Sequence, residues 1–189
     1  MAEILRRDFY ARDPVEVARS LLGCRLLRRV DGVCLGGRIT ETEAYVGAED
    51  SASHAYRGMT PRNRVMFGPP GHAYVYFVYG MHHMFNVVTG AEGVPWAVLI
   101  RGLAPELGLD AMRERRGRRP LADGPGKLCQ ALAIDRGFDA WDLTRGQALW
   151  IEAGEQVPDS AVAAGPRVGI DYALPQHREA PWRFCLLGN

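Results

Sequence analysis

The chain has 189 residues, of which 47% are hydrophobic, and these values fit one compact domain over residues 1–189 with a sizeable core. A formal net charge of +1 neither requires nor excludes a nucleic-acid partner, so the distribution of the basic residues has to decide. The sequence has no run of about 18 apolar residues to span a bilayer, and 1–22 lacks the apolar centre of a secretory signal, so we expect a soluble, intracellular protein without a membrane partner.

A helix and a hairpin are the first predicted elements. Segment 13–16 combines an N-cap acid, a proline at the first helical position and a glutamate at the third, so a helix should run from Pro14 to about Leu22 and stop at Gly23. Segment 24–30, the turn Asp31-Gly32 and the residues that follow predict a β-hairpin with a type I′ turn. Segment 47–71 is rich in small residues and arginine, and we expect it to be flexible.

Strand patterns dominate the rest of the chain. The strongest is AYVYFVY at 73–79, and further strands are predicted at 86–89, 96–102, 148–153, 167–172 and 183–187. Helices are predicted at 105–112 and from about Leu128, and the arginine-rich run at 113–119 is expected to be a mobile, solvated connection. Because strands and helices do not alternate regularly, we expect an α+β fold: a curved, mainly antiparallel, open-barrel-like sheet flanked by short helices.

The segment ITETEAYVG at 39–47 carries ionisable or aromatic groups at every second position. Strand side chains alternate, so Glu41, Glu43 and Tyr45 should share one face. Two acids on an inward face are unfavourable without a partner, and an edge strand whose acids face water is an equally good interpretation of this pattern.

Aromatic side chains in the strand at 73–79 fall on two faces. Tyr74 and Tyr76 share one parity, while Tyr79 has the opposite parity and stands next to Gly80 at an expected turn. The pattern places Tyr76 in a candidate pocket and Tyr79 at a protruding tip, although strand aromatics more often belong to the core.

Metal and cofactor signals are missing from the sequence. The four cysteines form no C-x-x-C pair, and the five histidines show no H-E-x-x-H spacing, so we expect neither a metal nor a cofactor. Lys127 is the only lysine, and it follows Gly-Pro-Gly, where backbone N–H groups and one ammonium could receive an anion. Arg62 and Arg64 suit phosphate contact, but a solvated loop fits them equally well.

Several of these segments resemble, in the same order, the alkyladenine (3-methyladenine) DNA glycosylase family, in particular its bacterial members. The resemblance covers nearly the whole chain. It rests on RITETEAYVG (38–47), His54, TPRNRVMF (60–67), YVYFVYGM (74–81), Asn86, VLIRGL (98–103), GPGKLCQALAI (124–134) and RVGI (167–170).

The resemblance implies a monofunctional DNA glycosylase that initiates base excision repair. Such an enzyme flips alkylated or deaminated purines, of the 3-methyladenine, 7-methylguanine and hypoxanthine class, out of duplex DNA and hydrolyses the N-glycosidic bond. Glu43 would be the general base, and Arg101 and the backbone carbonyl of Val168 would hold the water with it. A glutamate near its ordinary pKa of about 4.3 would be ionised for this role.

The resemblance also implies how the flipped base and the DNA are held. Tyr45 would stack on one face of the base, Tyr76 would contact the other, His54 would meet its edge, and Asn86 would discourage purines with a 2-amino group. The residues that would contact DNA are the wedge Tyr79 with its neighbours Gly80, Met81 and His82, together with Lys127. Arg62 and Arg64 are added to them because their loop suits phosphate contact. His82 departs from family members that carry tyrosine there. The expected partner is damaged double-stranded DNA, bound by a cytoplasmic, nucleoid-associated monomer.

Two other classes of protein stay open from the residues alone. A binding module could grip DNA or RNA through arginines and tyrosines without cutting it, but it leaves Glu43 beside Tyr45 unexplained. A metal-dependent hydrolase could use Glu41 and Glu43 as ligands, and sensitivity to a chelator would favour it.

Overall fold

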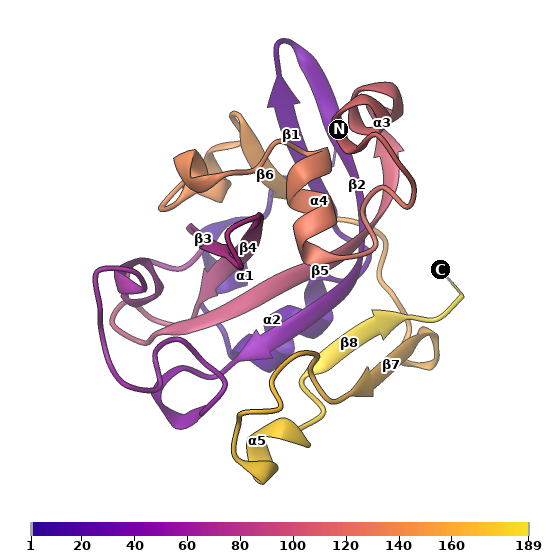
Figure 1. Ribbon diagram of the computed structural model, residues 1–189. Helices are drawn as coiled ribbons and strands as arrows, with labels where there is room; N and C mark the ends of the chain where they lie inside the picture. Colours follow the sequence, from indigo (N-terminus) through magenta and orange to yellow (C-terminus); the bar gives the residue numbers. More distant parts are fainter. Residues whose placement is uncertain (1, 189) are drawn as a thin grey trace.

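The computed structural model describes residues 2–188 and contains one antiparallel sheet (Figure 1). Six strands follow the order β3-β4-β5-β2-β1-β6, while β8 pairs with β2 and β7 pairs with β8. The strands are β1 (Arg25–Val30), β2 (Val33–Tyr45), β3 (Ala73–Val78), β4 (His82–Thr89), β5 (Trp96–Leu107), β6 (Leu149–Glu152), β7 (Val162–Gly165) and β8 (Arg183–Leu186). The predicted α+β fold with an open antiparallel sheet is confirmed.

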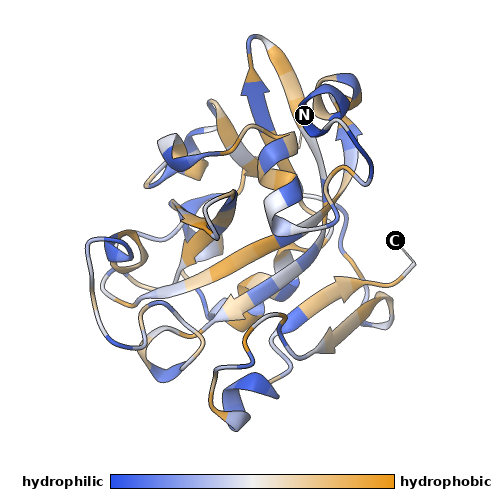
Figure 2. Ribbon diagram, in the orientation of Figure 1, coloured by the Kyte–Doolittle hydropathy of each residue, from blue (hydrophilic) through white to orange (hydrophobic). Residues whose placement is uncertain are grey.

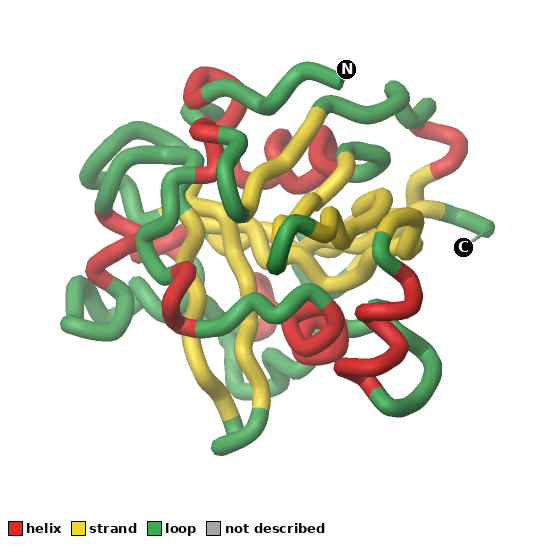
Figure 3. Tube along the Cα trace, turned by 90° about the horizontal axis from the view of Figure 1, so that it is seen from above, coloured by secondary structure: helices red, strands yellow, loops and turns green. Residues whose placement is uncertain are grey.

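Short helices lie around this sheet (Figure 3). Figure 1 shows α4 on one side of β5 and α2 on the other, so both faces of the central strands are covered. The α-helices are α1 (Arg7–Tyr10), α2 (Pro14–Leu21), α3 (Leu109–Arg116), α4 (Pro125–Ala131) and α5 (Pro175–Arg178). The 3₁₀ helices are η1 (Gly47–Glu49), η2 (Arg64–Phe67), η3 (Arg136–Phe138), η4 (Leu143–Arg145) and η5 (Asp159–Ala161). Across residues 2–188 no helix is long and apolar enough to cross a bilayer.

Local signals near the N-terminus predicted their elements correctly. The Asp13 carboxylate accepts hydrogen bonds from the N–H groups of Val15 and Glu16, which caps α2. Asp31 and Gly32 both have positive φ, at 49° and 80°, as a type I′ turn requires between β1 and β2.

Strand β2 lies inside the sheet, so the edge-strand interpretation is wrong. One of its edges pairs with β5, and the other pairs first with β1 and then with β8 at Glu41–Glu43. The register with β5 shifts on both sides of Glu41, which marks a β-bulge. Beyond this bulge the predicted alternation holds: Thr42 and Ala44 are buried in the core, and Glu43 and Tyr45 face the other way.

Hydrophobic residues occur along the strands of the sheet, as the orange segments of β5 and β8 show (Figure 2). The main core cluster joins α2, α4 and the strands from β1 to β6. Its largest fully buried members are Tyr10, Phe85, Leu21, Leu26, Leu35, Ile39, Ile100, Met112, Leu128 and Leu132. The four cysteines are free thiols, with Cys24 and Cys129 buried.

Three predicted elements differ from the structure. The helix predicted at 105–112 is wrong in its first half, because β5 continues to Leu107 and α3 begins only at Leu109. The run at 113–119 is not a solvated connection throughout, since it supplies the last turn of α3 and Arg116 is buried against Gln130. The strand predicted at 167–172 is a loop, and the late strand is instead β7.

The irregular segment 47–71 is packed against the sheet. Asp50, Ser53 and Asn63 are buried in it, and Met66 belongs to a second core cluster. The Asn63 side chain donates to the carbonyls of His54 and Gly58, so a buried amide anchors this part of the chain.

Candidate active site

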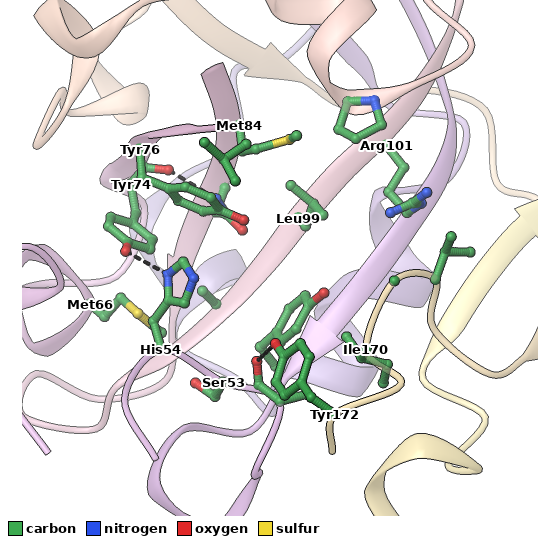
Figure 4. Close-up of a pocket in the computed structure, with 18 of the residues that line it drawn as sticks. Ser53, His54, Met66, Tyr74, Tyr76, Met84, Leu99, Arg101, Ile170 and Tyr172 are labelled. Atoms are coloured by element: carbon green, nitrogen blue, oxygen red, sulfur yellow. Dashed lines mark hydrogen bonds between the residues drawn. The ribbon is translucent and has the colours of Figure 1, made fainter. Parts of the chain in front are cut away.

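A pocket opens on one face of four neighbouring strands. The register aligns Tyr74 of β3 with Asn86 of β4, Leu99 of β5 and Glu43 of β2 in one row across the sheet. The cavity measures about 180 Å³ and is lined mainly by aromatic and apolar side chains (Figure 4). The residues that line it are Tyr45, Ala52, Ser53, His54, Met66, Tyr74, Tyr76, Val78, Tyr79, Met84, Asn86, Ala97, Leu99, Arg101, Pro125, Val168, Gly169, Ile170 and Tyr172.

Glu43 is fully buried directly behind the wall of this pocket. Its Oε1 accepts a hydrogen bond of 2.7 Å from the backbone N–H of Val168, and its Oε2 accepts one of 2.9 Å from the Tyr45 hydroxyl. Nη1 of Arg101 lies 3.3 Å from the same Oε2. All three partners line the pocket, so Glu43 is in direct contact with the groups that form its wall.

The surroundings of Glu43 act on its charge in opposite directions. Burial raises the pKa of the carboxyl above its ordinary value, while Arg101, the Val168 N–H and the Tyr45 hydroxyl lower it and leave a net increase. The expectation of an ordinary pKa is therefore wrong. A carboxylate with a raised pKa is a stronger base, which suits the abstraction of a proton from water.

Arg101 joins the two acids of β2. Its Nε donates to Glu41 Oε1 at 2.8 Å, and that same oxygen accepts from Arg183 Nε at 2.6 Å. Although burial alone would lower the pKa of Arg101, the carboxylates of Glu43 and Glu41 raise it. Glu41 is thus paired with two guanidinium groups and holds Arg101 in place.

No metal centre is found among the described residues. Within 2–188 no group of three or more His, Cys, Asp or Glu side chains is close enough to hold an ion. The two carboxylates proposed as ligands in the metal-hydrolase interpretation are bridged by Arg101 instead.

Tyr76, His54 and Tyr74 form one aromatic side of the pocket (Figure 4). The rings of His54 and Tyr76 meet edge to face with centroids 4.5 Å apart, and His54 Nδ1 lies 2.8 Å from the Tyr74 hydroxyl. The structure therefore brings His54 and Tyr76 together on one side of the cavity. It adds Tyr74, whose parity with Tyr76 was visible in the sequence.

The His54 ring is open toward the cavity but packs against these tyrosines. Desolvation, helped by nearby Arg62, lowers its pKa to about 4. A lowered histidine pKa means that the folded state binds the proton less well than the unfolded chain, so this ring weakens folding as the pH falls from about 6.5 toward 4. At neutral pH His54 is uncharged and presents a neutral ring to the cavity.

We expect an NMR titration to find His54 neutral down to about pH 5, with a midpoint near 4. Resonances of the wild-type protein would be assigned by comparison with a His54→Gln variant, which lacks the ring but retains a polar side chain. A midpoint at the ordinary value of about 6.5 would contradict the packing described for this ring.

Asn86 lies buried at the back of the pocket. Its side-chain amide donates to the Tyr74 carbonyl at 3.1 Å, which fixes the orientation of the amide group. Position 86 therefore offers a polar side chain with a fixed orientation to whatever enters the cavity.

The β3–β4 turn carries the exposed tip that the alternation predicted. Tyr79 is 80% exposed and has a positive φ of 55°, and the adjacent Gly80 has a φ of 67°. Positive φ is unusual for an aromatic residue and commonly marks a functional position. Met81 is also exposed, and the His82 ring lies against Gly126 at the start of α4, where it leaves little room for a side chain.

The basic residues predicted to contact DNA have different surroundings. Arg62 and Arg64 are exposed on either side of the buried anchor Asn63, and the Arg62 guanidinium lies 5.2 Å from the centre of the Tyr76 ring. Lys127 lies in the first turn of α4 and forms an ion pair of 2.8 Å with Asp123.

Sequence reasoning missed the wall contributed by the C-terminal part of the chain. The loop after β7 contributes Val168, Gly169, Ile170 and Tyr172, of which only the Val168 carbonyl was anticipated. In the structure the group of Val168 that contacts Glu43 is the backbone N–H, which donates a hydrogen bond to the carboxylate. The Tyr172 hydroxyl donates to the Ala52 carbonyl across the rim (Figure 4), a contact between segments 120 residues apart that no local pattern signals.

Comparisons with known proteins agree with the motifs. The sequence model of the family described as Methylpurine-DNA glycosylase (MPG) matches residues 8–189. A protein of Carboxydothermus hydrogenoformans named "Putative 3-methyladenine DNA glycosylase" is 51% identical over 98% of this chain and 96% of its own length. Proteins of the same name from Nitrosococcus oceani and Methanocella arvoryzae are 48% and 47% identical, over 100% and 96% of this chain and 92% and 91% of their own lengths.

Proposed function

Because the chain belongs to the methylpurine-DNA glycosylase family, we propose that it releases 3-methyladenine, 7-methylguanine and hypoxanthine-type purines from duplex DNA with Glu43 as the general base. The enzyme is a DNA glycosylase that acts in base excision repair, and it hydrolyses an N-glycosidic bond. Residues 1–189 act as one glycosylase domain, and the protein works as a monomer on DNA.

The burial of Glu43 behind the aromatic pocket is the observation that carries this proposal. A flipped purine enters the cavity between Tyr45 and Tyr76, with His54 at its edge and Asn86 behind it. As the bond to the base breaks, the sugar gains positive charge, and the glutamate beside it stabilises that charge and deprotonates the attacking water. Arg101 and the Val168 carbonyl hold the water with Glu43.

The exposed turn is proposed to open the duplex. Tyr79 enters the stack in place of the extruded nucleotide, with Gly80, Met81 and His82 along the groove. Extrusion of a base costs a few kcal/mol, which such a plug offsets. Arg62, Arg64 and Lys127 contact phosphates, and Lys127 would exchange its pairing with Asp123 for one with the backbone.

The function is tested with duplexes that each carry one lesion. We expect abasic sites to appear in duplexes with alkylated purines or hypoxanthine, to the same extent in EDTA. Borohydride should trap no covalent adduct with DNA, since a monofunctional glycosylase uses water and not an amine. Binding without release of any base would support the binding-module interpretation, and inhibition by EDTA would support the metal hydrolase.

The wedge is tested by Tyr79→Asn. Asparagine tolerates positive φ better than tyrosine, so folding stability should stay equal or rise by about 1 kcal/mol. Base release from duplex DNA should nevertheless fall about 10-fold, because the plug that compensates for unstacking is gone.

A matched variant, Tyr172→Asn, removes an exposed tyrosine at the rim of the pocket but not at the tip. Only Tyr79→Asn should lose more activity on duplex than on single-stranded substrate. Equal losses on both substrates would argue against a wedge. Activity would be followed under single turnover, and stability by denaturant unfolding.

A further inference from the structure

Arg167 and Asp50 form a fully buried ion pair beside the pocket. Both side chains are 0% exposed, and the guanidinium contacts both carboxylate oxygens, at 2.5 and 2.9 Å. A buried ion pair adds little to stability compared with apolar residues of similar volume, because desolvation offsets the attraction of the charges. A pair of this kind next to an active site therefore indicates a role in geometry.

The remaining contacts of Arg167 extend to three parts of the chain. Nη1 donates to the Ala44 carbonyl at 2.9 Å, and Nη2 donates to the His177 carbonyl at 3.1 Å. The planar group lies between the Tyr45 and Trp182 rings, at 4.6 and 4.9 Å from their centres. The planar guanidinium group has several N–H donors and two faces that stack on rings, so it can satisfy all these partners at once. A lysine ammonium cannot.

Arg167 fixes the position of the first hydrogen-bond donor to Glu43, the Val168 N–H, because the two residues are adjacent in the chain. Val168 is the next residue, and its N–H reaches Glu43 Oε1 at 2.7 Å. The loop around it has no regular secondary structure, so the Asp50 pair anchors the peptide that carries this donor.

Arg167 controls the second donor through a ring. The face of Tyr45 rests on the guanidinium, and the hydroxyl of the same ring donates to Glu43 Oε2 at 2.9 Å. One buried side chain therefore sets the position of both uncharged donors on the carboxylate.

We propose that Arg167, held by Asp50, is a positioning residue that orients the Glu43 carboxylate for catalysis by fixing the Val168 amide and the Tyr45 ring. This inference rests on the proposed function, in which Glu43 is the base. A displacement of about 1 Å at a catalytic group can lower a rate about 100-fold. Loss of the guanidinium group should therefore lower the rate of base release without lowering the affinity for DNA.

The primary test is Arg167→Lys, measured as single-turnover release of a lesion that the wild-type protein removes. We expect the rate to fall about 10- to 100-fold while affinity for an undamaged duplex stays within about 2-fold. Arg7→Lys serves as the matched control, because Arg7 pairs with Asp142 at 2.8 Å and lines no part of the pocket. It should retain the wild-type rate.

A pH profile separates positioning from general loss of structure. The hydrogen bonds from the Val168 N–H and the Tyr45 hydroxyl lower the pKa of Glu43, so displacement of these two donors raises that pKa. In a plot of the rate of base release against pH, the low-pH limb then moves to higher pH. Tyr45→Phe, which keeps the ring but removes the hydroxyl, should move the limb in the same direction. The groups that bear on Glu43 in this comparison are Arg101, Glu41, Tyr45, Tyr76, Tyr172 and Cys185.

A second variant keeps the test decisive if Arg167→Lys does not fold. Asp50→Asn combined with Arg167→Gln removes both charges, so no unpaired charge stays buried. It should show the same rate loss and the same shift of the limb. A wild-type rate and pH profile in either folded variant would overturn the inference, whereas an inactive wild-type protein on every lesion would overturn the proposed function instead.

Discussion

Replacement of Glu43 by glutamine should reduce base release about 10²- to 10⁴-fold, which is the range for loss of a general base. The amide has nearly the shape of the carboxylate and still accepts from the Val168 N–H, but it cannot take a proton from water. Duplex affinity should stay close to wild type, because the Glu43 side chain is fully buried and is not itself part of the surface. Single-turnover release and duplex binding, measured on the same preparation, check both statements.

Folding stability gives this variant an internal control. A carboxyl whose pKa is raised in the folded state adds stability only at low pH and loses it as the pH rises through the folded-state pKa. At neutral pH the glutamine removes that unfavourable ionisation, so the variant should unfold no more easily than the wild-type protein. If the variant lost folding stability as well as activity, misfolding would explain the lost activity. That result would contradict this account.

Glu41→Gln is the matched comparison. Glu41 lies two residues away on the same strand, but its carboxylate pairs with Arg101 and Arg183, whereas Glu43 also accepts from the Val168 N–H and the Tyr45 hydroxyl. Its removal should loosen Arg101 and slow base release by a smaller factor than Glu43→Gln. An equal or larger loss would mean that Glu43 is not the general base.

Replacement of Asp50 by alanine should lower the free energy of unfolding by about 3–5 kcal/mol. The change leaves the Arg167 guanidinium buried without its carboxylate, and it also removes the acceptor for the N–H groups of Val46 and Ala52. An unpaired buried charge is among the most destabilising changes that one substitution can make. Urea unfolding at neutral pH measures the loss.

Asp159→Ala is the control for this prediction. Asp159 also forms a close pair with an arginine, at 2.7 Å from Arg19, but its side chain is fully exposed. Exposed ion pairs contribute about 0–1 kcal/mol, so the control should change little. Similar losses in both variants would mean that burial of the Asp50 pair does not matter for folding.

Signals carried by neighbouring residues predicted much of the fold and part of the site. Capping at Asp13 and the Asp31-Gly32 turn depend only on local backbone geometry, and both occur as expected. The pattern at 73–79 likewise predicted that Tyr79 lies at an exposed tip and that Tyr76 lines the pocket, although Tyr79 also reaches the pocket rim. The family resemblance named Glu43, for which the residues alone left an exposed edge strand equally open.

The sequence by itself determined the α+β class, the principal strands and the family, because periodicity, caps and ordered motifs are properties of contiguous residues. Only the tertiary structure decided that β2 is internal, that Glu43 is buried with a raised pKa, and that Arg167 pairs with Asp50 from 117 residues away. The physical reason is that burial and electrostatics depend on which distant segments pack together. A local pattern describes one face of a strand and does not specify what covers it.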